Sequence, residues 1–256
     1  MILHIAIKSQ WEESVDKGHY GAPLLEKDRF IHCSKIENIV DVANSNDYLR
    51  NVKEQMVILC VDEEKLKAEV RYEQEGKLGI EFPHVYGLIN VDAVIDVVDL
   101  NKDVNGDFIF PDKLIKYVKY EKSCGAIIID NSLDTPKVLL IKHVNGEHMG
   151  FPKGHVEGNE TEVETAVREI KEETSLNVLI DDKFRYVTRY FPKNGVIKDV
   201  IYFIATPINN DIKVQDAEVL GFKWCTFNEA EKLITYRANL LALRAAKEYF
   251  RVEKYR

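Results

Sequence analysis

Cysteine is scarce in this 256-residue chain, which has four, and no two of them form a C-x-x-C pair. That scarcity excludes a disulfide-stapled scaffold and a cysteine-rich zinc site. Cys60 and Cys124 lie inside apolar, strand-like runs, and together with Cys33 and Cys225 they are predicted to be reduced, mostly buried thiols. No apolar run approaches the roughly 18 residues of a membrane span, and the first residues lack the charged start and long apolar stretch of a signal peptide. The sequence therefore predicts a cytoplasmic protein that does not associate with membranes.

Long Gly/Ser or Pro linkers, low-complexity tracts and internal repeats are also lacking, so a domain boundary must be read from where strand patterns restart. The first half ends with the strand-like run 93–100, a turn at Asn105-Gly106 and the segment 115–120, and a new apolar run begins at Ser123. With 45% hydrophobic residues, the chain is long enough for two cores. We expect an α+β protein with one domain over residues 1–118 and a second over residues 119–256.

Positive charge is in the minority, because 35 Lys and Arg face 43 Asp and Glu, for a net charge of −8. This balance argues against a general nucleic-acid or membrane-surface role. An anionic small molecule would need local positive charge and a metal ion to bind to such a protein.

Residues 150–176 carry the most informative pattern in the chain. Asn159, followed three residues later by Glu162, predicts the start of a helix. The apolar residues that follow recur at the spacing of a buried helical stripe. They are Val163, Ala166, Val167 and Ile170.

Three glutamates lie beside this stripe, and their spacing places them on one patch of the helix surface. Glu169, Glu172 and Glu173 stand at i, i+3 and i+4. Hard oxygen ligands gathered in this way suit Mg²⁺ or Mn²⁺, which bind substrate phosphates in the same coordination sphere. The alternative from the three residues alone is a solvated acidic helix face.

The whole segment resembles the signature of the Nudix hydrolases. The matching positions are Gly154, Glu160, Arg168, Glu169, Ile170, Glu172, Glu173 and Leu176. Ser175 stands where the signature has a second glycine. That glycine would end the helix in a left-handed conformation, which costs a serine about 1 kcal/mol, so we expect a slightly strained but working turn. The resemblance implies an α/β/α sandwich with a mixed sheet and metal-dependent hydrolysis of a phosphoanhydride bond.

Within this family, the chain is most similar to the asymmetrically cleaving diadenosine tetraphosphate hydrolases over about residues 121–250. The run P-K-G-H-V-E at 152–157 is their hallmark. Further matches are Lys198 before V-I-Y, Glu218 six residues before Trp224, and Tyr236 after the Glu229-Ala230 pair, whereas Met149 departs from the usual tryptophan. This resemblance implies a small-molecule nucleotide substrate, cleaved to ATP and AMP.

The resemblance also implies roles for individual residues. Lys153, His155 and Lys198 would bind phosphates, and Tyr202 and Tyr236 would stack on adenine. Arg168 would orient Glu169, and Gly154 would let the backbone approach the metal and phosphates without an intervening side chain. Glu218 would be a fourth metal ligand, with Glu169, Glu172 and Glu173, or the base that deprotonates water.

Purely structural roles remain as alternatives for several of these residues. Each tyrosine taken singly is more typical of a core residue, and His155 is equally suited to capping its loop. If the resemblance is set aside, the sequence around Glu218 predicts an exposed loop carboxylate. Rival functions are hydrolysis of ADP-ribose or of the 5′ triphosphate of RNA, and non-catalytic nucleotide sensing. The intact glutamate set argues against a pure sensor.

The N-terminal half contains three islands that suggest a pocket, at 3–5, 30–34 and 81–87. Together with the run 71–73 they resemble an uncharacterised bacterial domain family with an ADP-ribosyltransferase-like fold, over roughly residues 1–112. That resemblance implies a cleft for an NAD-like dinucleotide. The candidate contacts are His4, His32, Ser34, His84 and Tyr86.

Structural roles compete with this hypothesis. Ser34 with Glu37 predicts a capping box for a helix over 36–43, and Ser9 with Glu12 predicts one for the helix that holds Trp11. His32 is equally interpreted as an interior histidine.

Overall fold

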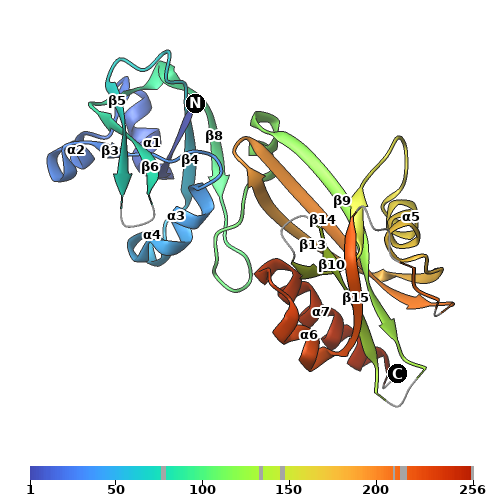
Figure 1. The fold of residues 1–256 in the computed structure, drawn as a ribbon. Coiled ribbons are helices and arrows are strands. Elements are labelled where there is room, and N and C mark those ends of the chain that lie inside the picture. The colour runs from blue at the N-terminus through green and yellow to red at the C-terminus, as the bar shows by residue number, and fades with distance from the viewer. Residues whose placement is uncertain (76–78, 133–134, 145–147, 210, 214–217, 255–256) are drawn as a thin grey trace. The chain divides into compact units, whose positions relative to one another are not determined.

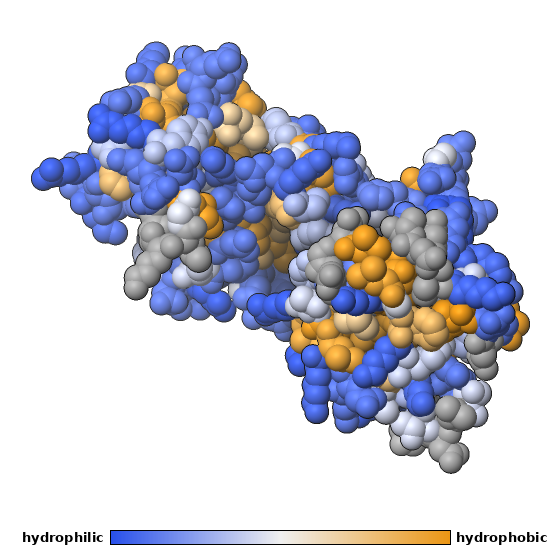
Figure 2. Space-filling view, viewed as in Figure 1, coloured by the Kyte–Doolittle hydropathy of each residue, from blue (hydrophilic) through white to orange (hydrophobic). Residues whose placement is uncertain are grey.

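The computed structural model describes residues 1–75, 79–132, 135–144, 148–209, 211–213 and 218–254. The chain divides into two compact units, Met1–Lys119 and Tyr120–Arg256. On the face shown in Figure 2, hydrophilic residues cover most of the surface, as expected for a chain with 30% charged residues. Among the described segments, no helix combines the length and apolar character needed to span a bilayer.

The first unit is built around an antiparallel sheet in the order β1-β4-β8. Its strands are β1 (Ile2–Ile7), β4 (Met56–Val61) and β8 (Val94–Leu100). Every residue of β4 is buried, because its alternate side chains enter two different apolar clusters, one on each face of the sheet. One cluster contains Trp11 and Tyr20, and the other contains Phe108 and Leu114.

A second sheet of this unit has the order β3-β6-β5, and a short pair joins β2 to β7. The strands are β2 (His19–Tyr20), β3 (Ile31–His32), β5 (Glu69–Glu75), β6 (Ile80–Tyr86) and β7 (Ile89–Asn90). The helices are α1 (Lys8–Val15), α2 (Ala22–Asp28), α3 (Ile39–Ser45), α4 (Asp47–Asn51) and the 3₁₀ turns η1 (Val91–Ala93) and η2 (Asp112–Tyr117).

Both capping boxes predicted in this unit are wrong. The cap of α3 is Asn38, without a side-chain bond, and the main chain of Ser34 instead pairs with Leu3. The cap of α1 is Ile7, and the Ser9 hydroxyl donates to Glu54. Ser9 lies within the first turn of α1 and so cannot cap it, and Ser34 lies in a bridge with Leu3, five residues before α3 begins.

The second unit is a sandwich of one sheet between helices (Figure 1). The main path of its seven-stranded sheet is β11-β10-β9-β14-β13, with β12 paired to β9 and β15 paired to β10. The strands are β9 (Lys119–Asp130), β10 (Lys137–His143), β11 (Met149–Gly150), β12 (Lys153–His155), β13 (Val178–Lys193), β14 (Val196–Pro207) and β15 (Val219–Thr226). The helices are α5 (Glu162–Thr174), α6 (Phe227–Leu233) and α7 (Arg237–Lys254).

Separate apolar clusters fill the two faces of this sheet. Ile127 and Val200 pack with residues of α6 and α7, whereas Ile128 and Ile201 pack with Ala166 and Ile170 of α5. The long β14 is therefore buried on both faces through its first ten residues. This arrangement is the α/β/α sandwich that the sequence predicted.

The start of α5 differs from the prediction, and its end agrees with it. Thr161, not Asn159, caps the helix, because its side chain accepts from the Glu164 N–H while the Glu164 carboxylate accepts from the Thr161 N–H. Val167 is 39% exposed, so it lies outside the buried stripe. At the other end, Ser175 adopts the expected left-handed conformation, with φ 61°.

Candidate active site

A cavity of about 430 Å³ opens between α5, the loop around β12 and β14 of the second unit. Its wall contains the three helix glutamates, the two predicted lysines, and Gly154, His155, Arg168 and Glu218. Four further lining residues were not predicted from the sequence. They are Ser123, His143, His148 and Glu157. Glu157 ends the P-K-G-H-V-E run, but Ser123, His143 and His148 belong to segments in which no motif was recognised, so only the fold brings them to the cavity.

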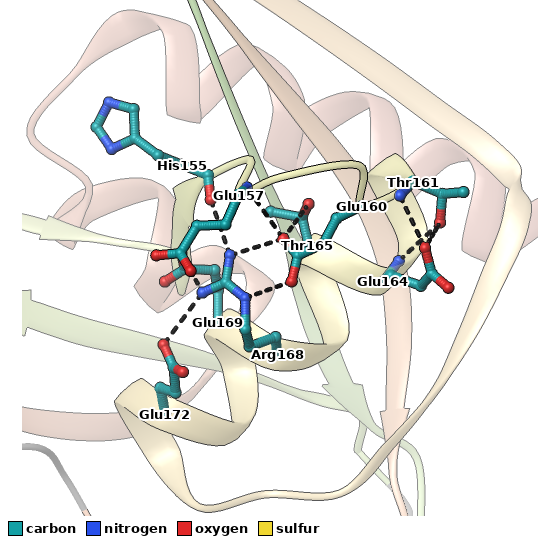
Figure 3. Close-up of polar contacts among 9 residues, drawn as sticks. All are labelled: His155, Glu157, Glu160, Thr161, Glu164, Thr165, Arg168, Glu169 and Glu172. Atoms are coloured by element: carbon teal, nitrogen blue, oxygen red, sulfur yellow. Dashed lines mark hydrogen bonds and ion pairs between the residues drawn. The ribbon is translucent and has the colours of Figure 1, made fainter.

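Arg168 connects the helix to the loop that precedes it (Figure 3). Its Nε and Nη2 donate to the Glu160 carboxylate at 2.7 and 2.9 Å, and Nη2 also donates to the His155 carbonyl at 2.8 Å. Its Nη1 donates to Glu169 at 2.8 Å and to Glu172 at 3.1 Å. The guanidinium lowers the pKa of Glu160 to about 2. Arg168 therefore positions two of the three helix glutamates.

The helix glutamates differ in burial, and the two buried ones, Glu169 and Glu173, have raised pKa values. Glu173 is 2% exposed, and burial raises its pKa to about 8, although its Oε2 accepts the Lys153 main-chain N–H at 2.8 Å. Burial also raises the pKa of Glu169, and Arg168 opposes that rise. The Glu172 side chain is 52% exposed. Two of the carboxylates are therefore held in a poorly solvated place where a cation would stabilise their charge.

Gly154 is required by the position of Glu169. A β-carbon at residue 154 would lie 2.0 Å from the carboxylate carbon and from both oxygens of Glu169. No side-chain adjustment accommodates an overlap of that size while the carboxylate stays in place. The glycine thus lets the loop lie directly against the carboxylate.

Cationic side chains gather next to these carboxylates. Lys198 is 9% exposed, and its Nζ lies 3.2 Å from Nε2 of His155. Burial and the nearby charge of Lys153 lower the pKa of Lys198. Burial, followed by the charge of Lys198, lowers the pKa of His155. Each of these groups would be stabilised by an anion, so this part of the cavity suits phosphates.

The two predicted stacking tyrosines have different environments. Tyr202 is 1% exposed and packs edge-on against Phe151, with its hydroxyl donating to Asn239. It has no free ring face, so its prediction as an adenine-stacking residue is wrong; its place on the buried β14 explains why. Tyr236 is 53% exposed and contacts the ring of His148 at 4.9 Å. Its outer face is open to solvent.

Two histidines extend from Tyr236 into the interior. The His143 ring stacks on His148 at 4.6 Å, and burial lowers the pKa of His143 to about 3. This imidazole is therefore neutral at physiological pH. Glu218 is exposed at the wall of the cavity, and its charge contributes to the raised pKa of both Glu169 and Glu173.

The carboxylates suit a hard divalent cation by their chemistry. Glu169 and Glu173 are buried, carry raised pKa values and lie at a cradle that a β-carbon at Gly154 would fill. Within the described segments, no three acidic, histidine or cysteine side chains are already arranged around a common metal position. Nη1 of Arg168 bridges Glu169 and Glu172 instead.

The predicted N-terminal pocket is only partly assembled. The rings of His32 and His84 lie 5.1 Å apart, and Phe30 contacts His84 at 4.2 Å and Tyr86 at 5.4 Å. Glu73 accepts hydrogen bonds from His84 and Tyr86 at 2.7 and 2.8 Å. This group forms a ring cluster on one face of the β3-β6-β5 sheet.

The structure does not bring His4 and Ser34 into the ring cluster, so they are not gathered with the other three predicted contacts. His4 is 6% exposed, with Nδ1 bonded to the His32 carbonyl and Nε2 3.3 Å from the Tyr20 hydroxyl. Ser34 is buried beside β1. Both side chains point into the interior because their strands pair there.

Protein-family models match both halves of the chain. Residues 119–244 match the NUDIX domain family, and residues 5–97 match a family described as a protein of unknown function (DUF952). The asymmetrical bis(5′-nucleosyl)-tetraphosphatase of Rattus norvegicus is 31% identical over 144 residues, which cover 50% of this chain and 94% of the relative.

Two solved structures are similar to the two halves. A C. elegans Ap4A hydrolase binary complex is 28% identical, covers 51% of this chain and 97% of its own, and has a TM-score of 0.48. Protein CC0527 from Caulobacter crescentus is 28% identical, covers 42% of this chain and 92% of its own, and has a TM-score of 0.37.

The fold and the carboxylate cavity define the second unit as a hydrolase of phosphoanhydride bonds. The chain belongs to the Nudix family through residues 119–244 and is a pyrophosphohydrolase. Nudix hydrolases generally use divalent metal ions, and homologues of this family bind small nucleotide substrates. In the first unit, residues 5–97 match the DUF952 family model.

Proposed function

We propose that this enzyme hydrolyses diadenosine tetraphosphate asymmetrically, giving ATP and AMP, with Mg²⁺ or Mn²⁺ as its metal. One observation carries the proposal: a single cavity combines buried carboxylates, Lys153 and Lys198, and reaches His148, on whose ring the exposed Tyr236 packs. The 31% identity to the rat asymmetrical tetraphosphatase supports the same substrate.

In this mechanism, Glu169, Glu172 and Glu173 would hold the metal, and Gly154 would keep the main chain of the loop clear of the Glu169 carboxylate. When bound, the ion stabilises negative charge that develops on the phosphate oxygens. Arg168 keeps the carboxylates oriented through its fork of hydrogen bonds.

The remaining residues bind the substrate and move one proton. Lys153, His155 and Lys198 neutralise and align the phosphate chain, and Tyr236 stacks on one adenine. Glu218 accepts the proton of the attacking water, because its carboxylate is exposed and lies at the cavity wall. Water then attacks an end phosphorus, and the longer product leaves as ATP.

Product analysis tests this proposal. The purified chain is incubated with Mg²⁺ and diadenosine tetraphosphate, ADP-ribose or RNA bearing a 5′ triphosphate, and kcat/KM is compared. We expect diadenosine tetraphosphate to give the highest value and equal amounts of ATP and AMP. Two ADP as the main products, or a higher kcat/KM for ADP-ribose or RNA, would refute it. Binding without turnover of any of the three would favour a nucleotide sensor.

For the N-terminal domain, we propose that the ring cluster binds an adenine dinucleotide or a fragment of one. The guanidinium of Arg71 lies 4.2 Å from the centroid of the Tyr86 ring, and the exposed His32 has its ring 5.1 Å from that of His84. Aromatic faces with a cation suit a base and a phosphate.

The full chain carrying Glu173→Gln, which blocks hydrolysis, is titrated with NAD and ADP-ribose. Heat released on binding should disappear when Tyr86→Ala is added and persist with Tyr48→Ala, a tyrosine of the same domain that is 68% exposed. Equal binding by both double variants, or none at millimolar ligand, would contradict the proposal.

A further inference from the structure

Ser123 is a fully buried residue of the active-site wall whose hydroxyl has no hydrogen-bond partner among the described residues. Nearly all buried polar groups in folded proteins are paired, because an unpaired one keeps its full desolvation cost. An unpaired hydroxyl at the wall of a binding cavity therefore points to a partner that arrives with the ligand.

The strand register places this hydroxyl among the cationic groups of the site. In the β12–β9 pair, Ser123 lies directly opposite His155, and Gly125 lies opposite Lys153. Directly opposed residues, and residues two apart on a strand, project from the same face of a sheet. Ser123, His155 and Lys153 consequently share one face, and Lys198 reaches the same place, with Nζ 3.2 Å from Nε2 of His155.

The chemistry of these neighbours defines the ligand group. Two ammonium groups, one imidazole and one hydroxyl all donate hydrogen bonds, and a phosphate oxygen accepts from each of them. A carboxylate also lies beside this set, since Oε2 of Glu121 is 3.7 Å from Nε2 of His155.

We propose that Ser123 donates a hydrogen bond to a phosphate oxygen of the bound substrate and so positions the polyphosphate chain. This inference rests on the proposed function, because it assumes that the polyphosphate chain of the substrate binds in this cavity.

Inorganic tripolyphosphate is the probe, titrated calorimetrically into the full chain with excess Mg²⁺. Ser123→Ala should raise its Kd about tenfold, the effect of losing one hydrogen bond to a charged group. The melting temperature of the ligand-free variant should be unchanged or about 2 °C higher, because no bond inside the protein is lost. Thr188→Val is the matched control. Thr188 is also buried in this unit, but its hydroxyl donates to the Val200 carbonyl. The Kd of this variant for tripolyphosphate should equal that of the wild type.

An unchanged Kd for Ser123→Ala would overturn the inference. A fall of several degrees in its melting temperature would do so too, because the hydroxyl would then have a partner within the protein. The two proposals fail separately. Wild-type enzyme that yields ATP and AMP while Ser123→Ala binds tripolyphosphate normally refutes only the role of Ser123. A tenfold loss of binding in an enzyme that does not cleave diadenosine tetraphosphate refutes only the substrate.

Discussion

Replacing Glu173 by Gln should separate the catalytic use of this carboxylate from its cost to stability. The side chain is 2% exposed, and its Oε2 accepts the Lys153 main-chain N–H at 2.8 Å. Glutamine has nearly the same shape and can accept the same hydrogen bond, but it carries no charge. We expect kcat to fall by about three orders of magnitude or more, because a metal ligand is lost, while the fold is retained.

The size of the stability effect follows from the raised pKa. Burial raises the pKa of Glu173 from 4.5 to about 8. Between these pH values the Glu173 carboxyl binds more protons in the folded protein than in the unfolded chain. The contribution of Glu173 to the free energy of unfolding is therefore fully present below pH 4.5 and is lost as the pH rises toward 8. The loss is at most about 1.4 kcal/mol for each pH unit. Glu173→Gln removes this dependence, so the variant should exceed the metal-free wild type by a few kcal/mol at pH 8.

Scanning calorimetry between pH 5 and pH 8.5, with a chelator present, measures this difference for the transition of the second unit. Glu172→Gln is the control, because it removes the same chemical group from a side chain that is 52% exposed. That variant should lose activity and follow the wild-type dependence of stability on pH. Parallel pH profiles for the wild type and Glu173→Gln would refute the reasoning, as would wild-type activity that persists in excess chelator.

Three further predictions concern single residues. Gly154→Ala should lower kcat at least about a hundredfold without changing the circular dichroism spectrum, because its β-carbon would displace the Glu169 carboxylate; near-normal kcat would contradict the close approach seen here. Tyr236→Ala should raise KM for diadenosine tetraphosphate about tenfold with little change in kcat, as expected for a lost stacking face; an unchanged KM would remove Tyr236 from the adenine site. Burial lowers the pKa of His4 from 6.5 to about 4, so the stability that it contributes above pH 6.5 is lost as the pH falls toward 4. His4→Gln should therefore flatten the acid side of the first unit's stability profile in calorimetry, and a profile identical to that of the wild type would show that another group causes it.

The local sequence determined the parts of this protein that depend on neighbouring residues. The α5 glutamates lie on one patch because a helix repeats every 3.6 residues, and Ser175 ends the helix where a glycine was expected. The strand-like runs of the second unit form its sheet, and the resemblance of residues 150–176 to the Nudix signature was sufficient to predict the hydrolase family. Even here the cap moved from Asn159 to Thr161, because two local motifs competed and the hydrogen bonds of the folded loop selected one.

Only the tertiary structure decided which residues reach the cavity and which lie in the core. Tyr202 follows Lys198 on the same strand, yet its ring is enclosed between the sheet and α7, whereas Tyr236 is exposed. His4 and Ser34 were predicted at a pocket, and strand pairing turned both inward. Ser123 and His143 carry no motif at all. They line the active site because antiparallel pairing sets β9 and β10 beside strands distant in sequence, and burial and cross-strand register are properties of that pairing, not of the neighbours along the chain.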